Sequence, residues 1–170
     1  RADVVNTLAD EAESETYGYI GFSMGGRTGL ELAASTPKRL SMLAIGGMHL
    51  LPPTANADRF IRHTKILRSG RAKSVEKPDG DRPGNDPLAL AASHEALLWW
   101  KGVDGRLDSL NAPTLLFCGE EDAHFPNAEE SSRHYGFEFA GLPNTDHNST
   151  FFSSEIAVNS VTKFVAKHLK

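Results

Sequence analysis

The sequence predicts an α/β protein with a mostly parallel sheet and helices on both faces. Segments typical of strands alternate with segments typical of amphipathic helices, an order that favours parallel strands joined by right-handed crossovers. The segments 40–45 and 114–118 are hydrophobic apart from Ser41 and Thr114, as expected of strands buried on both faces of a parallel sheet. The 170 residues have the length of one ordinary domain.

The first third of the chain predicts a helix, a strand, a second helix and a second strand. The opening segment has apolar residues at helical spacing, namely Val5, Leu8, Ala9 and Ala12. The short aromatic run 17–21 is bounded by glycine and favours a strand. After a glycine-rich turn, the second helix is expected from about Gly26 to a stop before Pro37, and the run 40–45 is the second strand.

The middle of the chain, 49–105, differs in composition and is predicted to be a helical lid inserted into the core. Apolar residues within 60–67 favour a short helix, and the stretch 68–86, rich in glycine, proline and charge, favours an exposed loop. Asp86-Pro87 has the character of an N-cap followed by a first-turn proline. The helix behind it contains Leu90, Leu97, Leu98, Trp99 and Trp100.

The last third, 106–170, returns to alternating strands and helices and is predicted to complete a core that begins with 1–48. A strand at 114–118, a helix at 127–134 and a strand at 137–140 are expected in that order. Ser153 or Ser154 is the expected N-cap of a closing helix. The apolar face of this helix consists of Val158, Val161, Val165 and Leu169.

Charge and composition exclude several classes of function. Eighteen basic and 22 acidic residues give a net charge of −4, which argues against a nucleic-acid partner bound through a basic face. No apolar run approaches the ~20 residues of a membrane span, so no membrane partner is expected. The single cysteine, Cys118, cannot form an internal disulfide and is compatible with a reducing, cytoplasmic location. Without a ligand cluster or a phosphate-binding glycine loop, neither a metal nor a cofactor is expected.

The most specific motif is Gly21-Phe22-Ser23-Met24-Gly25, which matches G-x-S-x-G between a predicted strand and a predicted helix. The flanking glycines let both backbones pass close to the serine, whose hydroxyl is thereby exposed at the carboxyl end of the strand. The backbone N–H of Met24, at the helix N-terminus, would point at a developing oxyanion. We therefore predict a nucleophile elbow; the alternative is a glycine-rich turn with a chance serine.

A serine nucleophile needs a base that is oriented by a third group. Of the seven histidines, His147 is the predicted base because it lies in a loop between the last strand and the last helix; His124 is its rival. The predicted acid is Asp122, which directly follows the strand 114–118. The adjacent alternatives are Glu120, Glu121 and Asp146.

With these motifs the chain resembles the α/β-hydrolase superfamily, of the small-lid esterase and lactonase-like type. The resemblance rests on Gly-Phe-Ser-Met-Gly-Gly at 21–26, on the segment 112–122, which ends in Gly-Glu-Glu-Asp, and on Leu-Pro-Asn-Thr-Asp-His at 142–147. It implies a catalytic triad in the order Ser23, Asp122, His147. In this family about half of the domain precedes the elbow and completes the oxyanion hole, so the resemblance implies a C-terminal portion, weakly active or inactive by itself.

The predicted reaction is acyl transfer to water on a small or medium carboxylic ester, lactone or thioester. A cofactor-free haloperoxidase or perhydrolase and a carbon–carbon bond hydrolase are alternatives within the fold. An alternative of another class is a non-catalytic protein that holds a ligand or partner in the same pocket. The expected partner is a small-molecule substrate, and the pocket candidates are Phe22, His49, Trp99 and Trp100. The two tryptophans are also explained by packing of the lid on the core.

Overall fold

The structure, a computed structural model, describes residues 2–52, 57–69, 86–152 and 154–169. The chain divides into two compact units, one of Arg1–Leu51 with Val103–Lys170 and one of Pro52–Gly102. The second unit occupies nearly the same range as the predicted lid insertion. The predicted exposed loop at 68–86 falls almost wholly outside the described residues.

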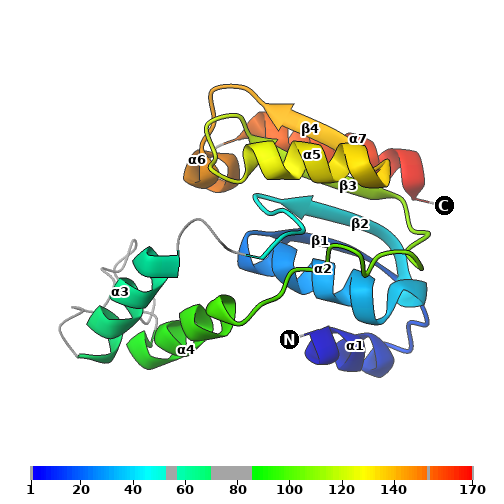
Figure 1. The fold of residues 1–170 in the computed structure, drawn as a ribbon. Helices are drawn as coiled ribbons and strands as arrows, with labels where there is room; N and C mark the ends of the chain where they lie inside the picture. The colour runs from blue at the N-terminus through cyan, green and yellow to red at the C-terminus, as the bar shows by residue number, and fades with distance from the viewer. Residues whose placement is uncertain (1, 53–56, 70–85, 153, 170) are drawn as a thin grey trace, which may run out of the picture. The chain divides into compact units, whose positions relative to one another are not determined.

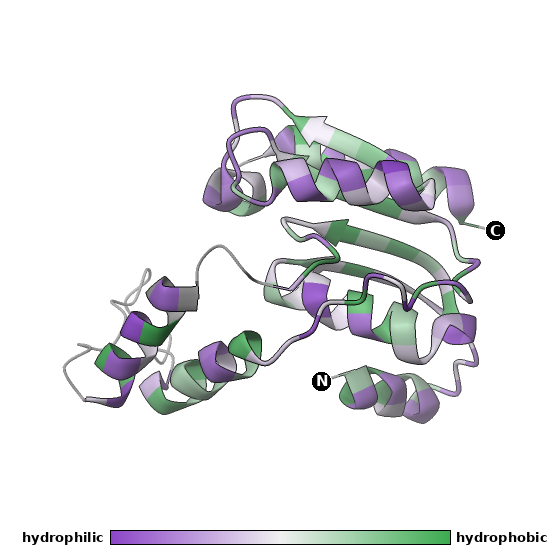
Figure 2. Ribbon diagram, in the orientation of Figure 1, coloured by the Kyte–Doolittle hydropathy of each residue, from purple (hydrophilic) through white to green (hydrophobic). Residues whose placement is uncertain are grey.

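The first unit is built on four parallel strands in the order β1-β2-β3-β4 (Figure 1). They are β1 (Tyr17–Phe22), β2 (Leu40–Gly46), β3 (Thr114–Gly119) and β4 (Glu138–Leu142). Apart from Ser41, every residue of the two central strands is buried, which explains their hydrophobicity (Figure 2). The parallel sheet confirms the predicted fold class.

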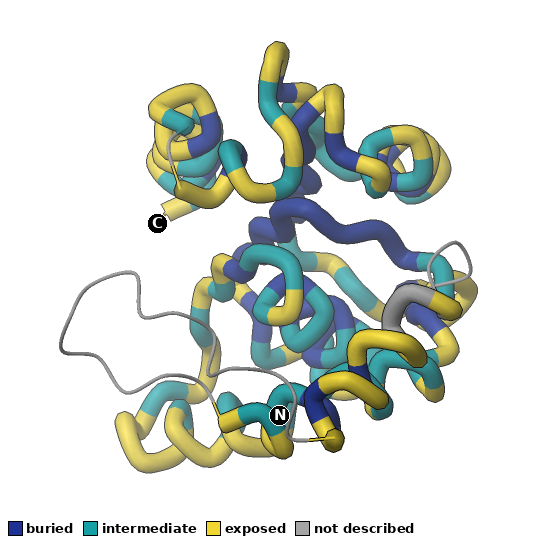
Figure 3. The backbone as a smooth tube through the Cα atoms, turned by 90° about the vertical axis from the view of Figure 1, so that its left-hand side faces the viewer, coloured by how far each residue is buried: buried dark blue, intermediate teal, exposed yellow. Residues whose placement is uncertain are grey.

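Helices cover both faces of this sheet (Figure 1). They are α1 (Ala2–Glu11), α2 (Met24–Ser35), α5 (Phe125–Tyr135), α6 (His147–Phe152) and α7 (Glu155–His168), with a 3₁₀ turn at Pro37–Arg39. Side chains of β2 point alternately to the two faces. Met42 and Ala44 form a core cluster with Ala157 and Phe164 of α7, whereas Ile45 faces α2 on the other side. Buried residues accordingly lie mainly on the strands, and the helix faces that point away from the sheet are exposed (Figure 3).

The prediction of a loop around His147 is wrong, because this residue begins the short helix α6. Asp146 caps the helix: its carboxylate accepts the Ser149 N–H at 2.7 Å, and its carbonyl accepts the Thr150 N–H at 3.0 Å. The closing helix α7 is capped by Ser154, one of the two predicted residues, whose hydroxyl accepts the Ala157 N–H at 3.0 Å.

The second unit contains two helices that pack on each other, α3 (Ala57–Arg68) and α4 (Pro87–Leu98). Asp86 caps α4 as predicted, with its carboxylate accepting the Leu88 N–H at 2.9 Å. Arg68 of α3 donates two hydrogen bonds, of 2.8 and 2.6 Å, to the carboxylate of Glu95 in α4. None of the helices in the described ranges combines the length and apolarity that crossing a lipid bilayer requires.

Glycines allow α2 to lie close against the sheet. A Cβ atom on Gly29 would stand 2.6 Å from Cδ1 of Ile45. At the elbow itself, a Cβ on Gly21 would stand 2.5 Å from the carbonyl oxygen of Gly25, a contact that only a backbone shift can relieve. The turn from β1 into α2 is therefore as tight as the motif requires.

We expect Gly21→Ala to lower the free energy of unfolding by about 1–3 kcal/mol, because its methyl group overpacks against backbone atoms. The matched control is Gly25→Ala, where the nearest atom to a new Cβ is the Tyr19 hydroxyl oxygen at 3.9 Å. This second change should be neutral or stabilising by up to about 1 kcal/mol, since alanine favours a helix over glycine. Urea denaturation followed by circular dichroism measures both; equal losses would contradict the close approach at Gly21.

Candidate active site

Ser23 occupies a strained turn between β1 and α2. Its backbone dihedrals are φ 53° and ψ −112°, a conformation that costs a non-glycine residue of order 1–3 kcal/mol. Hydrogen bonds hold it from two sides: its N–H donates to the Gly46 carbonyl at 2.8 Å, and its carbonyl accepts the Arg27 N–H at 3.0 Å. The Tyr19 hydroxyl donates to the Gly25 carbonyl at 2.9 Å and fixes the far side of the turn.

The structure brings the three predicted catalytic side chains into one hydrogen-bonded row. Nε2 of His147 lies 2.9 Å from Oγ of Ser23, and Nδ1 of His147 lies 2.7 Å from Oδ2 of Asp122. Each residue follows the carboxyl end of a different strand, and in a parallel sheet these ends share one edge. This arrangement can transfer a proton from the serine to the imidazole while the carboxylate holds the ring.

Asp122 is the carboxylate that contacts His147, and its side chain is only 2% exposed. Burial alone would raise the pKa of Asp122, but hydrogen bonds from His147 and from the His124 N–H, at 3.0 Å, outweigh it and lower the pKa. The carboxylate is therefore ionised at neutral pH. The alternative acids lie elsewhere: Glu120 and Glu121 are exposed, and Asp146 caps α6.

Main-chain hydrogen bonds join the loop of Asp122 to the segment before His147. The Glu120 N–H donates to the Leu142 carbonyl, and the Glu121 N–H donates to the Thr145 carbonyl, both at 3.0 Å. The two backbones approach so closely that a Cβ on Gly119 would collide with the Thr145 carbonyl oxygen. The spacing between acid and base is thus set by the backbone.

Two of the other predicted site residues, Met24 and Phe22, adjoin Ser23 or His147. Met24 is the first residue of α2, so its N–H belongs to the first-turn donors that lack a partner within their own helix. The Phe22 ring lies 4.9 Å from the His147 ring, measured between centroids. Trp99, 76% exposed, and Trp100 belong to the second unit, and their role in a pocket stays a prediction.

A row of three histidines crosses the site. Ring centroids lie 5.1 Å apart between His49 and His124, and 5.6 Å apart between His124 and His147. His49 was predicted only as a pocket residue and His124 only as a rival base. The sequence could have indicated that His49 and His124 lie close together, because both follow the carboxyl ends of the neighbouring strands β2 and β3.

Burial lowers the pKa of both additional histidines. The pKa of His49 falls to about 4, mainly because of burial, and the neighbouring His124 and Arg27 further disfavour its protonation. The Nδ1 atom of His49 accepts the Leu51 N–H at 3.1 Å. The pKa of His124 is also lowered, first by burial, although the charge of Asp122 acts in the opposite direction. Both rings are therefore neutral at pH 7.

The same residues include a set that could hold a metal ion. Asp122, His124 and His147 each offer one ligand atom, and these atoms lie within 4.8 Å of one another. No metal was expected because no such cluster of ligands is visible in the sequence, where His147 lies 23 residues after His124. Two loops from different strand ends bring them together.

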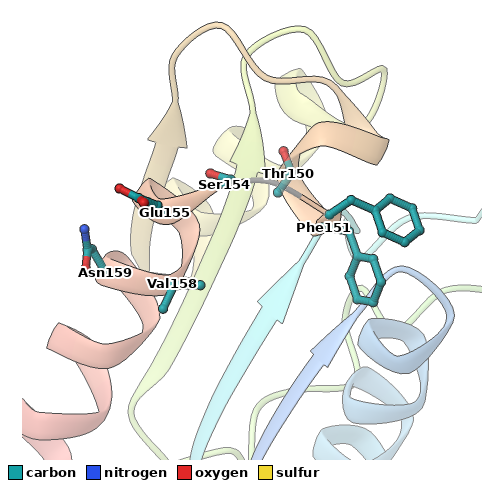
Figure 4. Close-up of a pocket in the computed structure, with 7 residues that line it drawn as sticks. Thr150, Phe151, Ser154, Glu155, Val158 and Asn159 are labelled. Atoms are coloured by element: carbon teal, nitrogen blue, oxygen red, sulfur yellow. The ribbon is translucent and has the colours of Figure 1, made fainter.

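A separate hollow of about 410 Å³ lies along α6 and the first turns of α7 (Figure 4). Its lining consists of Thr150, Phe151, Phe152, Ser154, Glu155, Val158 and Asn159. Ser23, Asp122 and His147 are not among the lining residues. One lining residue adjoins the site: the Phe151 ring lies 5.3 Å from that of Phe22, measured between centroids.

We expect stability to fall between pH 6.5 and pH 4 through His49. In this window the unfolded chain binds a proton on His49 and the folded chain does not, so acidification favours unfolding. The fall of the His49 pKa from 6.5 to about 4 corresponds to a full contribution of about 3.5 kcal/mol, at about 1.4 kcal/mol per pKa unit. His49→Asn, whose amide oxygen can still accept the Leu51 N–H, should flatten this part of the profile in urea titrations. The exposed His134→Asn should leave it unchanged, and an unaltered slope in His49→Asn would contradict the assignment.

No protein-family model matches this sequence. Among curated proteins, the "Putative carbamate hydrolase RutD" of Yersinia enterocolitica is 27% identical over 150 aligned residues. The match covers 74% of this chain and 54% of that protein, so the chain spans about half the length of this relative.

Solved structures of hydrolases superpose on nearly the whole chain. A carboxylesterase from Nitrososphaera gargenis has a TM-score of 0.82 at 14% identity and covers 99% of this chain. An alpha/beta hydrolase from a Medee basin deep-sea metagenome has a TM-score of 0.78 at 14% identity and covers 97%. The enol-lactonase from Burkholderia xenovorans LB400 has a TM-score of 0.71 at 19% identity and also covers 97%. The matches span 70–71% of these structures, and the chain therefore has a partial α/β-hydrolase fold.

Proposed function

We propose that this chain carries the catalytic residues of a serine hydrolase that cleaves ester-type bonds through an acyl-serine intermediate. The observation that carries the proposal is the row of hydrogen bonds from Ser23 through His147 to Asp122, at 2.9 and 2.7 Å. A nucleophile, a base within reach of it and a third group that orients the base are what covalent acyl transfer requires.

The reaction begins with attack of Ser23 Oγ on the substrate carbonyl carbon while Nε2 of His147 takes the hydroxyl proton. Asp122 accepts the Nδ1–H of His147, holds the ring in this tautomer and stabilises the imidazolium. The Met24 N–H supports the oxyanion of the tetrahedral intermediate. His147 then protonates the leaving group, and a water molecule, activated by the same base, hydrolyses the acyl-serine.

The proposed substrates are small or medium carboxylic esters, lactones and thioesters. The similar proteins are described as a carbamate hydrolase, a carboxylesterase and an enol-lactonase, and bonds of these kinds can all be cleaved by attack on an acyl carbon. Turnover with peroxide in place of water, or on a carbon–carbon bond, would use the same residues. A panel of these substrates separates the alternatives.

The strain at Ser23 argues against a purely binding function. A non-glycine residue at φ 53° and ψ −112° lowers stability, and a ligand-binding surface gains nothing from it. In a nucleophile elbow, the same conformation presents the hydroxyl to substrate and keeps the following N–H groups free for the oxyanion.

A fluorophosphonate probe, which reacts with an activated serine, should label the chain at one site. Ser23→Ala should abolish labelling because it removes the attacking oxygen. The matched control is Ser35→Ala, which removes an exposed hydroxyl from the other end of the same helix and should label like the wild type. Mass spectrometry of the labelled peptide identifies the site; labelling that persists in Ser23→Ala would refute the assignment.

We further expect His147→Gln and Asp122→Asn to differ in severity. Losing the base should slow hydrolysis of a p-nitrophenyl ester more than losing the orienting carboxylate does, by roughly 10²-fold. Rates relative to wild type, with circular dichroism to verify folding, provide the comparison. Asp146→Asn, in contrast, acts on the cap of α6 and should change the rate far less; if it were the more damaging change, Asp122 would not be the orienting acid.

A further inference from the structure

We infer that Asp122, His124 and His147 form a binding site for one divalent transition-metal ion, of the chemistry of Zn²⁺, and that the bound ion switches the serine off. The inhibitory part rests on the proposed function, whereas the binding site itself does not.

The geometry needed for binding is nearly present. One ligand atom from each residue lies within 4.8 Å of the others, and Nδ1 of His147 is already 2.7 Å from Oδ2 of Asp122. Zinc holds nitrogen and oxygen ligands at about 2.0–2.2 Å, which separates tetrahedral ligand atoms by roughly 3.4 Å. The widest pair therefore has to close by up to about 1.4 Å, and the pair at 2.7 Å has to open by about 0.7 Å. Rotation of an imidazole about its side-chain bonds accomplishes a movement of that size.

The backbone keeps two of the three ligands together before any ion arrives. The main-chain N–H of His124 donates to Oδ1 of Asp122 at 3.0 Å, which leaves Oδ2 on the side of His147. Because Asp122 and His124 share one turn after β3, bringing them together has little entropic cost. The third ligand, His147, begins α6, and main-chain hydrogen bonds join the segment before it to this turn.

The ligand set selects the class of ion. Two imidazoles and a carboxylate suit Zn²⁺ and its neighbours in the first transition row, whereas Mg²⁺ and Ca²⁺ prefer oxygen alone. Three protein ligands leave a fourth position of the tetrahedron for water. The His147 side chain is 34% exposed and that of Asp122 only 2%, so the ion enters from the side of the imidazole.

Binding and catalysis exclude each other because both use Nδ1 of His147. In the active tautomer Nδ1 carries the proton and Nε2 accepts the one from Ser23. An ion on Nδ1 takes the lone pair there, so the single proton of the neutral ring resides on Nε2. No proton is released, but Nε2 becomes a donor to Ser23 Oγ and can no longer act as base. Asp122 is also bound to the ion and no longer orients the ring.

The test is titration of the full chain, stripped with EDTA, with ZnCl₂ in a calorimeter. We expect one site per chain, weakened at least tenfold by His124→Gln and also by His147→Gln, a second variant at another ligand. The control His94→Gln removes a histidine from another close pair, His63 and His94, whose ring centroids lie 4.9 Å apart. It should bind as the wild type does. Unchanged affinity in His124→Gln, or loss of the site in His94→Gln, would overturn the proposed site.

The second readout is the rate of fluorophosphonate labelling with and without ZnCl₂, each variant compared with its own metal-free rate. In the wild type Zn²⁺ should slow labelling at least tenfold and EDTA should restore it, whereas His124→Gln should respond much less. A chain that binds Zn²⁺ at this site and still labels at full rate would overturn the inhibition. Failure to label without metal would count against the hydrolase, while the calorimetric result would still stand by itself.

Discussion

Parallel pairing of the strands is the constraint on which the candidate site depends. Ser23 and His147 are 124 positions apart in the chain, and Asp122 and His147 are 25 apart. Their side chains meet because β1, β3 and β4 run in the same direction and end at the same edge. An antiparallel neighbour would have carried one of these residues to the opposite edge. The two additional histidines reach the site by the same rule, from the ends of β2 and β3.

The strain of Ser23 is sustained by packing that is spread over several elements. The carbonyl of Gly46 at the end of β2 accepts the Ser23 N–H, so the neighbouring strand fixes the turn. The missing side chain of Gly21 lets the first turn of α2 fold back over β1. A turn that stores energy in this way persists only where its surroundings over-determine it. Here the central sheet supplies that rigidity, with β2 and β3 buried almost completely.

Much of this organisation could be predicted because its signals are local. The apolar runs of β2 and β3, the glycine spacing around Ser23 and the capping residues Asp86 and Ser154 each act within a few positions. Local patterns of this kind could not predict contacts between side chains that are far apart in the sequence. The row of His49, His124 and His147 depends on which loops adjoin in space, and its lowered pKa values depend on burial that no local pattern reports. The helix at His147 was missed although its signal was local, because the pairing of Asp146 with Ser149 resembles a turn as much as a cap.

Main-chain hydrogen bonds between the segments 120–121 and 142–145 fix the positions of the acid and the base. The groups that hold the two loops together are therefore not the side chains that react. Amides and carbonyls, which every residue except proline supplies, fix where the acid and the base stand. The reactive side chains merely project from that frame. A lineage could therefore exchange the carboxylate, the imidazole or the alcohol for other groups and keep the scaffold, provided that Gly119 remained without a side chain. Single substitutions at these three positions would then change the chemistry while the conformations of the loops stayed the same.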